Sequence, residues 1–204
     1  MLGDAYKFVL PIIGAAVIAG WLGLIWFACG LLLPAAFVCY FFRNPKRKIP
    51  EGRNLVVSPA DGKIVRISPV TNENEDNERL LVSIFLNIFD VHVNRSPIKG
   101  VVHQLEYKRG KFKVAFDEDA SRVNEQNIIT INGDGIEVIV KQIAGLIARR
   151  VVCWKALGGK VERGELIGLI RFGSRVDVIL PKQTKILVRM GDSVKGGSSI
   201  IGEY

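Results

Sequence analysis

The chain of 204 residues has few of the side chains on which many catalytic sites depend. Its only histidines are His92 and His103, which are too few for a histidine-rich zinc centre. Its three cysteines, Cys29, Cys39 and Cys153, show no spacing typical of a disulfide framework or a metal site. We therefore expect unpaired cysteines in a reducing compartment and no bound metal.

Charge is absent from one long segment near the N-terminus. From Phe8 to Phe42 there is no Asp, Glu, Lys, Arg or His. A bilayer core requires about 20 apolar helical residues, so this run is long for one span and short for two. Because Pro34 would kink a helix, either one span with a bent continuation or a tight, shallow hairpin fits. A cleaved signal peptide is disfavoured, since the run is too long and Lys7 is the only positive side chain before it.

Basic residues follow this segment directly. Four lie within the stretch 43–48, and such a cluster predicts that the domain after it is cytoplasmic. The net charge of +8 favours an anionic lipid surface as partner, with solvated surface charge as the alternative. No nucleic-acid-binding motif is present. We expect an N-terminal helical membrane anchor over residues 1–49, at the cell membrane, and a second domain over 50–204 on its cytoplasmic face.

The second domain is predicted to be mainly β. Short runs rich in valine and isoleucine alternate with glycine, asparagine, aspartate and proline, which is typical of strands and turns. The expected strands are 63–67, 79–86, 128–131, 136–140, 176–180 and 185–189. The sequence Asn-Gly-Asp-Gly at 132–135 predicts a hairpin, the polar stretch 71–78 an exposed loop, and 144–150 a weak helical turn.

A faint internal repeat relates residues 161–168 to 194–202. Each copy places a glycine-containing turn before a short apolar strand, as in the folded-over barrels or sandwiches of lipoyl and biotinyl carriers. This pattern leaves open a non-enzymatic membrane adaptor or carrier. A carrier needs a modified lysine at a hairpin tip, usually beside methionine or acidic residues, and neither Lys160 nor Lys195 has that setting.

The pair Gly173–Ser174 is the most informative dipeptide of the chain. Taken alone it reads as a turn between two strands, and it lacks the Gly-x-Ser-x-Gly elbow of a hydrolase. Its surroundings, however, resemble the processing site of the short-form phosphatidylserine decarboxylases. Four further blocks in the order of that family are similar as well, and together the matching segments are 58–62, 87–97, 120–127, 147–150 and 170–181.

The resemblance implies a pyruvoyl-dependent decarboxylase made as a proenzyme. Ser174 would attack the Gly173 carbonyl, and the chain would separate into a β chain, 1–173, and an α chain, 174–204, that stay together as a heterodimer. Ser174 would become a pyruvoyl group that forms a Schiff base with phosphatidylserine and releases phosphatidylethanolamine and CO₂. No external cofactor is implied.

The resemblance also implies roles for two further residues. From pattern alone, His92 reads as a structural histidine and Asp61 as a turn aspartate. The resemblance makes His92 the acid–base group, which suits the near-neutral pKa of an ordinary histidine, and Asp61 the carboxylate that orients it. Some longer relatives carry a second histidine where this chain has Arg95, so His92 would serve both self-cleavage and decarboxylation, or another group would do one of them. His103 reads as structural.

The substrate is less well defined than the reaction. Arg95, Arg149 and Arg150 are candidate phosphate partners, or simply solvated arginines. A related serine phospholipid with different tails would present the same amine and carboxylate. A pyruvoyl decarboxylase for a soluble amino acid is disfavoured by the predicted anchor.

Overall fold

The computed structural model describes residues 3–72, 75–112, 120–145, 150–171 and 174–204. The chain forms two compact units, residues 1–46 and 47–204.

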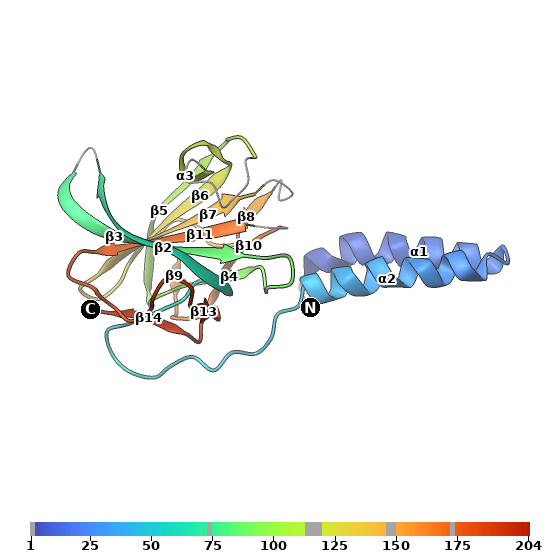
Figure 1. Cartoon of the computed structure of the whole chain (residues 1–204), viewed down its shortest axis with the longest axis horizontal. Coiled ribbons are helices and arrows are strands. Elements are labelled where there is room, and N and C mark those ends of the chain that lie inside the picture. Colours follow the sequence, from blue (N-terminus) through green and yellow to red (C-terminus); the bar gives the residue numbers. More distant parts are fainter. Residues whose placement is uncertain (1–2, 73–74, 113–119, 146–149, 172–173) are drawn as a thin grey trace. The chain divides into compact units, whose positions relative to one another are not determined.

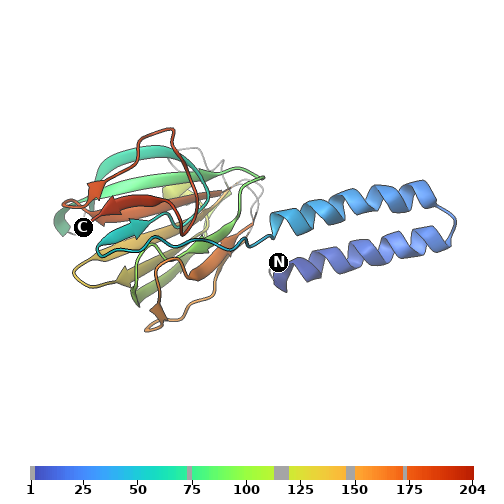
Figure 2. The same ribbon diagram turned by 90° about the horizontal axis from the view of Figure 1, so that it is seen from below.

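The first unit is a hairpin of two apolar helices (Figure 2). A 3-10 turn, η1 (Gly3–Ala5), leads into α1 (Tyr6–Trp21), and α2 (Ile25–Phe41) runs back beside it. Gly23 allows the reversal, because its φ of +79° belongs to the left-handed region that glycine adopts freely. The hairpin alternative is thus the one observed, and Pro34 lies inside α2. None of the helices in the described ranges is both long and apolar enough to cross a membrane.

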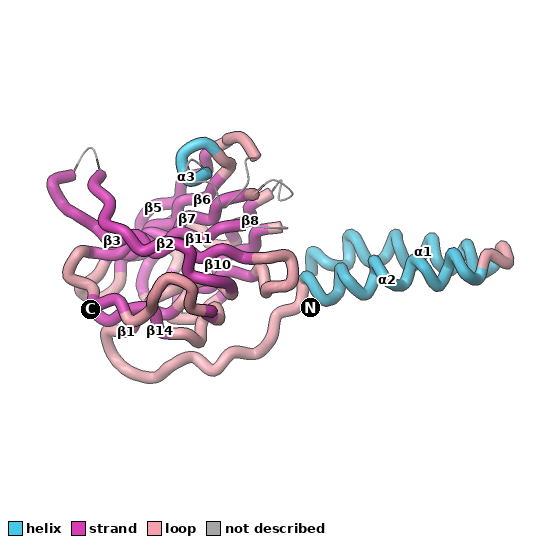
Figure 3. The backbone as a smooth tube through the Cα atoms, viewed as in Figure 1, coloured by secondary structure: helices cyan, strands magenta, loops and turns pink. Residues whose placement is uncertain are grey.

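The second unit is built almost entirely of strands, with one short helix, α3 (Ala120–Val123) (Figure 3). Its strands are β1 (Leu55–Val57), β2 (Gly62–Asn72), β3 (Glu75–Leu86), β4 (Val93–Arg95), β5 (Gly100–Lys108), β6 (Gln126–Asn132), β7 (Glu137–Ala144), β8 (Val151–Cys153), β9 (Lys160–Val161), β10 (Leu166–Ile170), β11 (Ser174–Pro181), β12 (Lys185–Ile186), β13 (Ser193–Val194) and β14 (Ile200–Glu203).

One large sheet dominates this unit. Eight strands in the order β13-β2-β3-β11-β7-β6-β5-β9 form a curled sheet, and two three-stranded sheets, β1-β14-β12 and β4-β10-β8, accompany it (Figure 1). Alternate side chains of the large sheet are fully buried and apolar, including Val82 and Ile84 on β3 and Val176 and Val178 on β11. They pack with apolar residues of the smaller sheets, such as Ile167, into one core.

These observations confirm a mainly β domain. Four of the six expected strands lie inside observed ones, and the expected strand 136–140 begins one residue before β7. The expected strand 185–189 is shorter, since β12 ends at Ile186. The expected loop at 71–78 is wrong, because β2 and β3 pair as far as Asn72 and Glu75. The expected helical turn at 144–150 is wrong at Ala144, which ends β7, while 146–149 lie outside the described residues.

The internal repeat has a structural counterpart. Gly164 and Gly197 have φ values of +79° and +77°, and each precedes a short strand, β10 or β14. Side chains added at either glycine would meet Ile49, which lies against both turns. The two copies therefore form neighbouring turns around one apolar side chain.

Candidate functional site

Ser174 is the first residue of β11, in the middle of the large sheet. It pairs with Leu86 at the end of β3 and with Ala144 at the end of β7. The side chain is fully buried, and within the described parts of the chain its Oγ has no hydrogen-bond partner. A buried hydroxyl without a partner costs about 1–3 kcal/mol, so its presence calls for a functional reason. Gly173, the other half of the expected cleavage site, lies outside the described residues.

His92 is buried at the same end of the sheet. It directly precedes β4, and its carbonyl accepts a hydrogen bond of 3.2 Å from the N–H of Ile170 at the end of β10. Only three residues separate Ile170 from Ser174. His92 and Ser174 lie 82 positions apart in the sequence, and His92 binds a residue only four positions before Ser174.

One hydrogen bond fixes the tautomer of His92. Its Nδ1 lies 3.0 Å from the carbonyl oxygen of Asp90. A carbonyl oxygen only accepts, so Nδ1 carries the hydrogen and Nε2 is the basic nitrogen of the neutral ring. The imidazole is thus prepared to take a proton at Nε2.

Three buried side-chain amides form a hydrogen-bonded row across β6, β7 and β4. The Asn127 amide donates to Gln142 Oε1 at 3.2 Å, and Gln142 Nε2 donates to Asn94 Oδ1 at 2.7 Å. The three side chains, at most 5% exposed, come from β6, β7 and β4. Gly168 of β10 leaves room for the row, since a Cβ there would lie 2.6 Å from Gln142 Nε2. The row connects the strand after His92 to the large sheet.

A neighbouring amide fixes the strand beside Ser174. The Nδ2 of Asn124 donates to the carbonyl oxygen of Ala144 at 2.8 Å, and Ala144 is the β7 residue opposite Ser174. The Ala144 N–H donates in turn to the Glu125 carbonyl at 2.9 Å. Asn124 and Glu125 thus fix the end of β7 that pairs with Ser174.

Asp61, directly before β2, has other contacts than the sequence suggested. The Arg47 Nη2 donates to its two carboxylate oxygens at 2.8 and 2.6 Å, and the Gly196 N–H donates to Oδ1 at 2.8 Å. Arg95 lies close by: burial and the charge of Arg47 lower the pKa of its guanidinium, while Asp61 acts in the opposite direction. The orienting role of Asp61 toward His92 stays a prediction.

Two of the three candidate phosphate partners lie within the described residues. The Arg95 Nη1 donates to the Gly164 carbonyl at 2.8 Å, so part of this guanidinium is committed to the fold. Arg150 is exposed, and its carbonyl accepts from the N–H of Arg171 at 3.3 Å. Arg149 lies outside the described residues. His103 lies exposed on β5, away from the core.

The opposite face of β11 carries a buried ion pair that sequence reasoning missed. Arg175 Nε lies 2.9 Å from Asp177 Oδ1, and both side chains are at most 4% exposed. Lys141 pairs opposite Asp177, and burial lowers the pKa of its ammonium group. The signal was the alternation of apolar and charged residues after Ser174, which is typical of a strand with two different faces.

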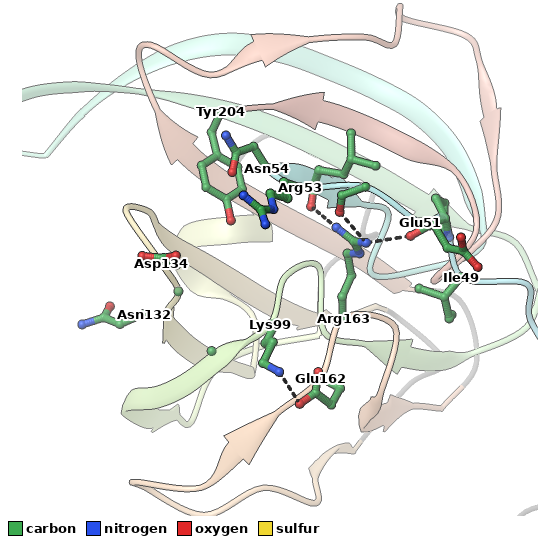
Figure 4. Close-up of a pocket in the computed structure, with 15 residues that line it drawn as sticks. Ile49, Glu51, Arg53, Asn54, Lys99, Asn132, Asp134, Glu162, Arg163 and Tyr204 are labelled. Carbon is green, nitrogen blue, oxygen red and sulfur yellow. Dashed lines mark hydrogen bonds and ion pairs between the residues drawn. The ribbon is translucent and has the colours of Figure 1, made fainter.

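A separate cavity of about 920 Å³ lies at the other end of the domain (Figure 4). Arg163 binds the carbonyls of Pro50 and Gly52 there at 2.7 and 3.0 Å, and Lys99 pairs with Glu162 at 3.0 Å. Antiparallel strands β5 and β6 run from this cavity to the neighbourhood of β11's first residue, a distance of about 20 Å. The cavity is therefore not part of the site around Ser174.

Comparison with known proteins identifies the family of this chain. Residues 35–202 match the family described as phosphatidylserine decarboxylase. The phosphatidylserine decarboxylase proenzyme of Solibacter usitatus is 51% identical over 194 residues, covering 95% of this chain and 92% of the relative. Those of Syntrophus aciditrophicus and Symbiobacterium thermophilum are 49% and 47% identical, covering 88% and 94% of this chain and 85% and 92% of theirs. The chain belongs to the phosphatidylserine decarboxylase family.

Proposed function

We propose that this protein decarboxylates phosphatidylserine to phosphatidylethanolamine, using a pyruvoyl group that it makes from Ser174 by cutting the Gly173–Ser174 bond. The observation that carries this proposal is the buried Ser174 hydroxyl, which has no partner in the described structure, at the same end of the sheet as His92. The family assignment is the second support. Membership of this enzyme family argues against a non-enzymatic carrier or adaptor.

Self-cleavage follows from ordinary acyl chemistry. With His92 Nε2 taking the hydroxyl proton, Ser174 Oγ attacks the Gly173 carbonyl, and the amide becomes an ester. Loss of the α-proton of residue 174 then expels the Gly173 carboxylate and leaves dehydroalanine. Its imine tautomer takes up water, releases ammonia and leaves a ketone at the new N-terminus. The hydrogen bond to the His92 carbonyl from the N–H of Ile170, four positions before Ser174 in the chain, supports this role for His92.

The same position suits the decarboxylation. The pyruvoyl carbonyl supplies an electron sink for the electrons of the bond that the departing carboxylate leaves. The buried, low-dielectric surroundings of residue 174 favour conversion of the charged carboxylate into neutral CO₂, and His92 can return a proton to the product carbon. The pyruvoyl group would form from Ser174 itself, so no other molecule has to be bound to supply it.

The two fragments remain associated in this proposal because the cut leaves the sheets intact. The α fragment, 174–204, contributes β11 between β3 and β7, and β13 and β14 pair with β2 and β1 of the other fragment. Separation would expose the β11 core residues Val176, Val178 and Leu180, which are fully buried. We therefore expect a heterodimer of the two fragments.

The N-terminal unit has the composition of a membrane attachment. Its helices expose large apolar side chains, among them Trp21 and Trp26 at 87% and 91%. The basic stretch 43–48 that follows would favour the anionic cytoplasmic leaflet. We propose that the hairpin holds the domain at the cell membrane, with the catalytic domain on the cytoplasmic side, where a two-tailed substrate resides.

The function is tested by incubating the purified full chain with vesicles that contain phosphatidylserine and measuring phosphatidylethanolamine by mass spectrometry. Wild-type protein should form it without added cofactor. Ser174→Ala should form none, because neither the nucleophile nor the carbonyl precursor is present. Product from Ser174→Ala at the wild-type rate would contradict the proposal.

Two variants can distinguish the proposed role of Asp61 in self-cleavage from its ion pair with Arg47. We expect Asp61→Asn to slow self-cleavage at least tenfold by removing a negative charge from this end of the sheet. Arg47→Met should instead lower the free energy of unfolding by about 2 kcal/mol, since it removes the charge-assisted hydrogen bonds to Asp61 and leaves only that from the Gly196 N–H, while cleavage persists. Urea unfolding and a time course of fragment formation measure the two effects. Equal slowing of cleavage in both variants would show that Asp61 only holds Arg47.

A further inference from the structure

The turn between β3 and β4 holds two apolar side chains out toward solvent. Ile88 is 36% exposed and Phe89 is 60% exposed. The turn is rigid: the Asn87 N–H donates to Asp90 Oδ2 at 2.9 Å, and the Phe89 N–H donates to Asn87 Oδ1 at 2.8 Å. An exposed phenylalanine at the tip of a hydrogen-bonded turn loses little further entropy when it is buried by a partner.

This turn adjoins both residues of the candidate site. Leu86, the residue before it, pairs with Ser174, and the carbonyl of Asp90 at its end binds His92 Nδ1. Figure 1 shows the connection from β3 to β4 at the same end of the domain as the end of β10. A partner that bound this turn would therefore lie beside Ser174 and His92.

A second exposed aromatic side chain lies at this end, with basic neighbours. Tyr107, near the end of β5, is 52% exposed. Arg109, two positions after Tyr107, and Arg150, directly before β8, are exposed as well. Burial and then Glu125 raise the pKa of the Tyr107 phenol, and the charges of these two arginines lower it. Antiparallel pairing of β5, β6 and β7 brings this end of β5 to the end of the sheet where β11 begins.

We propose that these five side chains form a rim that seats the active site on the surface of a lipid bilayer containing anionic lipid; the rim consists of Ile88, Phe89, Tyr107, Arg109 and Arg150. Aromatic and aliphatic side chains partition into the interfacial region, and arginines bind the phosphate groups there. This inference rests on the proposed function. It adds the surface through which a two-tailed substrate reaches the buried residue 174.

A second copy of the chain fits the rim less well. A stable interface between proteins buries about 800 Å² on each partner, which a few protruding side chains do not supply. A basic rim on a chain of net charge +8 would also repel its own copy. An anionic lipid surface complements the same charge, and a bilayer accepts separate apolar side chains without a shaped pocket.

The test uses the processed full-length protein with the double substitution Ile88→Ser and Phe89→Ser. Its initial rate is measured on phosphatidylserine in phosphatidylcholine vesicles and on dihexanoyl phosphatidylserine below its micelle-forming concentration. We expect the vesicle rate to fall roughly tenfold or more, because burial of one large apolar side chain changes a partition equilibrium by at least that factor. The rate on the monomeric substrate should fall much less, because that substrate reaches the site without contact to a bilayer.

Leu157→Ser is the matched control. Leu157 is 67% exposed on the turn between β8 and β9, and this turn contacts the start of β5, at the opposite end of that strand from Tyr107. It should leave both rates unchanged. An equal fall of both rates in the double variant, or a change in its oligomeric mass, would contradict the proposed contact between the rim and the bilayer. No turnover of either substrate by the wild type would instead contradict the proposed function.

Discussion

Replacing His92 with glutamine is expected to slow self-cleavage of the proenzyme by about 10²–10⁴-fold, the usual contribution of a positioned general base. Glutamine keeps a polar side chain in the buried position but has no basic nitrogen to take the Ser174 proton. The hydrogen bond from Nδ1 to the Asp90 carbonyl is the reason for assigning the base to Nε2. The rate is measured as the appearance of the fragment 174–204 after cell-free synthesis.

His103→Gln provides the control for this prediction. His103 is the only other histidine, and it lies exposed on β5. Its replacement should leave the cleavage rate unchanged. If His92→Gln cleaved at the wild-type rate while remaining folded, another group would have to be the base, and the assignment of His92 would be wrong.

Replacing Gln142 with methionine is expected to reduce both stability and self-cleavage. Methionine has nearly the same shape, but it leaves the buried Asn94 Oδ1 without its donor and the Asn127 amide without its acceptor. We expect the free energy of unfolding to fall by about 3 kcal/mol. We also expect cleavage by the folded fraction to slow at least tenfold, since β4 would no longer hold His92 firmly. Urea unfolding and the cleavage time course give the two values.

Gln126→Met separates this positioning effect from general destabilisation. Gln126 is 3% exposed on the neighbouring strand β6, and its Nε2 donates at 3.1 Å to the Ser121 carbonyl, outside the amide row. It should lose stability while its folded fraction still cleaves at the wild-type rate. Equal cleavage by folded Gln142→Met and folded wild type would mean that the row serves stability alone.

Much of the fold could be predicted from local sequence because its signals are local. Alternating apolar residues predict strands such as 176–180, and Asn-Gly-Asp-Gly predicts the hairpin between β6 and β7, where the Gly133 N–H donates to the Ile136 carbonyl at 2.8 Å. The polar ends of β2 and β3 were missed because pairing with a neighbouring strand overrides low strand propensity.

The candidate site could be predicted only in part. Ser174 and His92 were found through segments that resemble a family. Asn94 and Gln142 were missed because 48 positions separate them in sequence, and nothing local indicates that their amides meet. The partnership of Asp61 with Arg47 was missed for the same reason, and also because Arg47 belongs to a stretch that reads as a basic juxtamembrane segment.

The central claim, that Ser174 becomes a pyruvoyl group by self-cleavage, is tested most directly by intact mass spectrometry of the purified full chain and of Ser174→Ala. The account predicts two wild-type fragments, 1–173 and 174–204, with the smaller one carrying the mass of an N-terminal pyruvoyl group in place of serine, and an uncut mutant. A wild-type chain that stays at full length with Ser174 unmodified, in membranes or after purification, would contradict it.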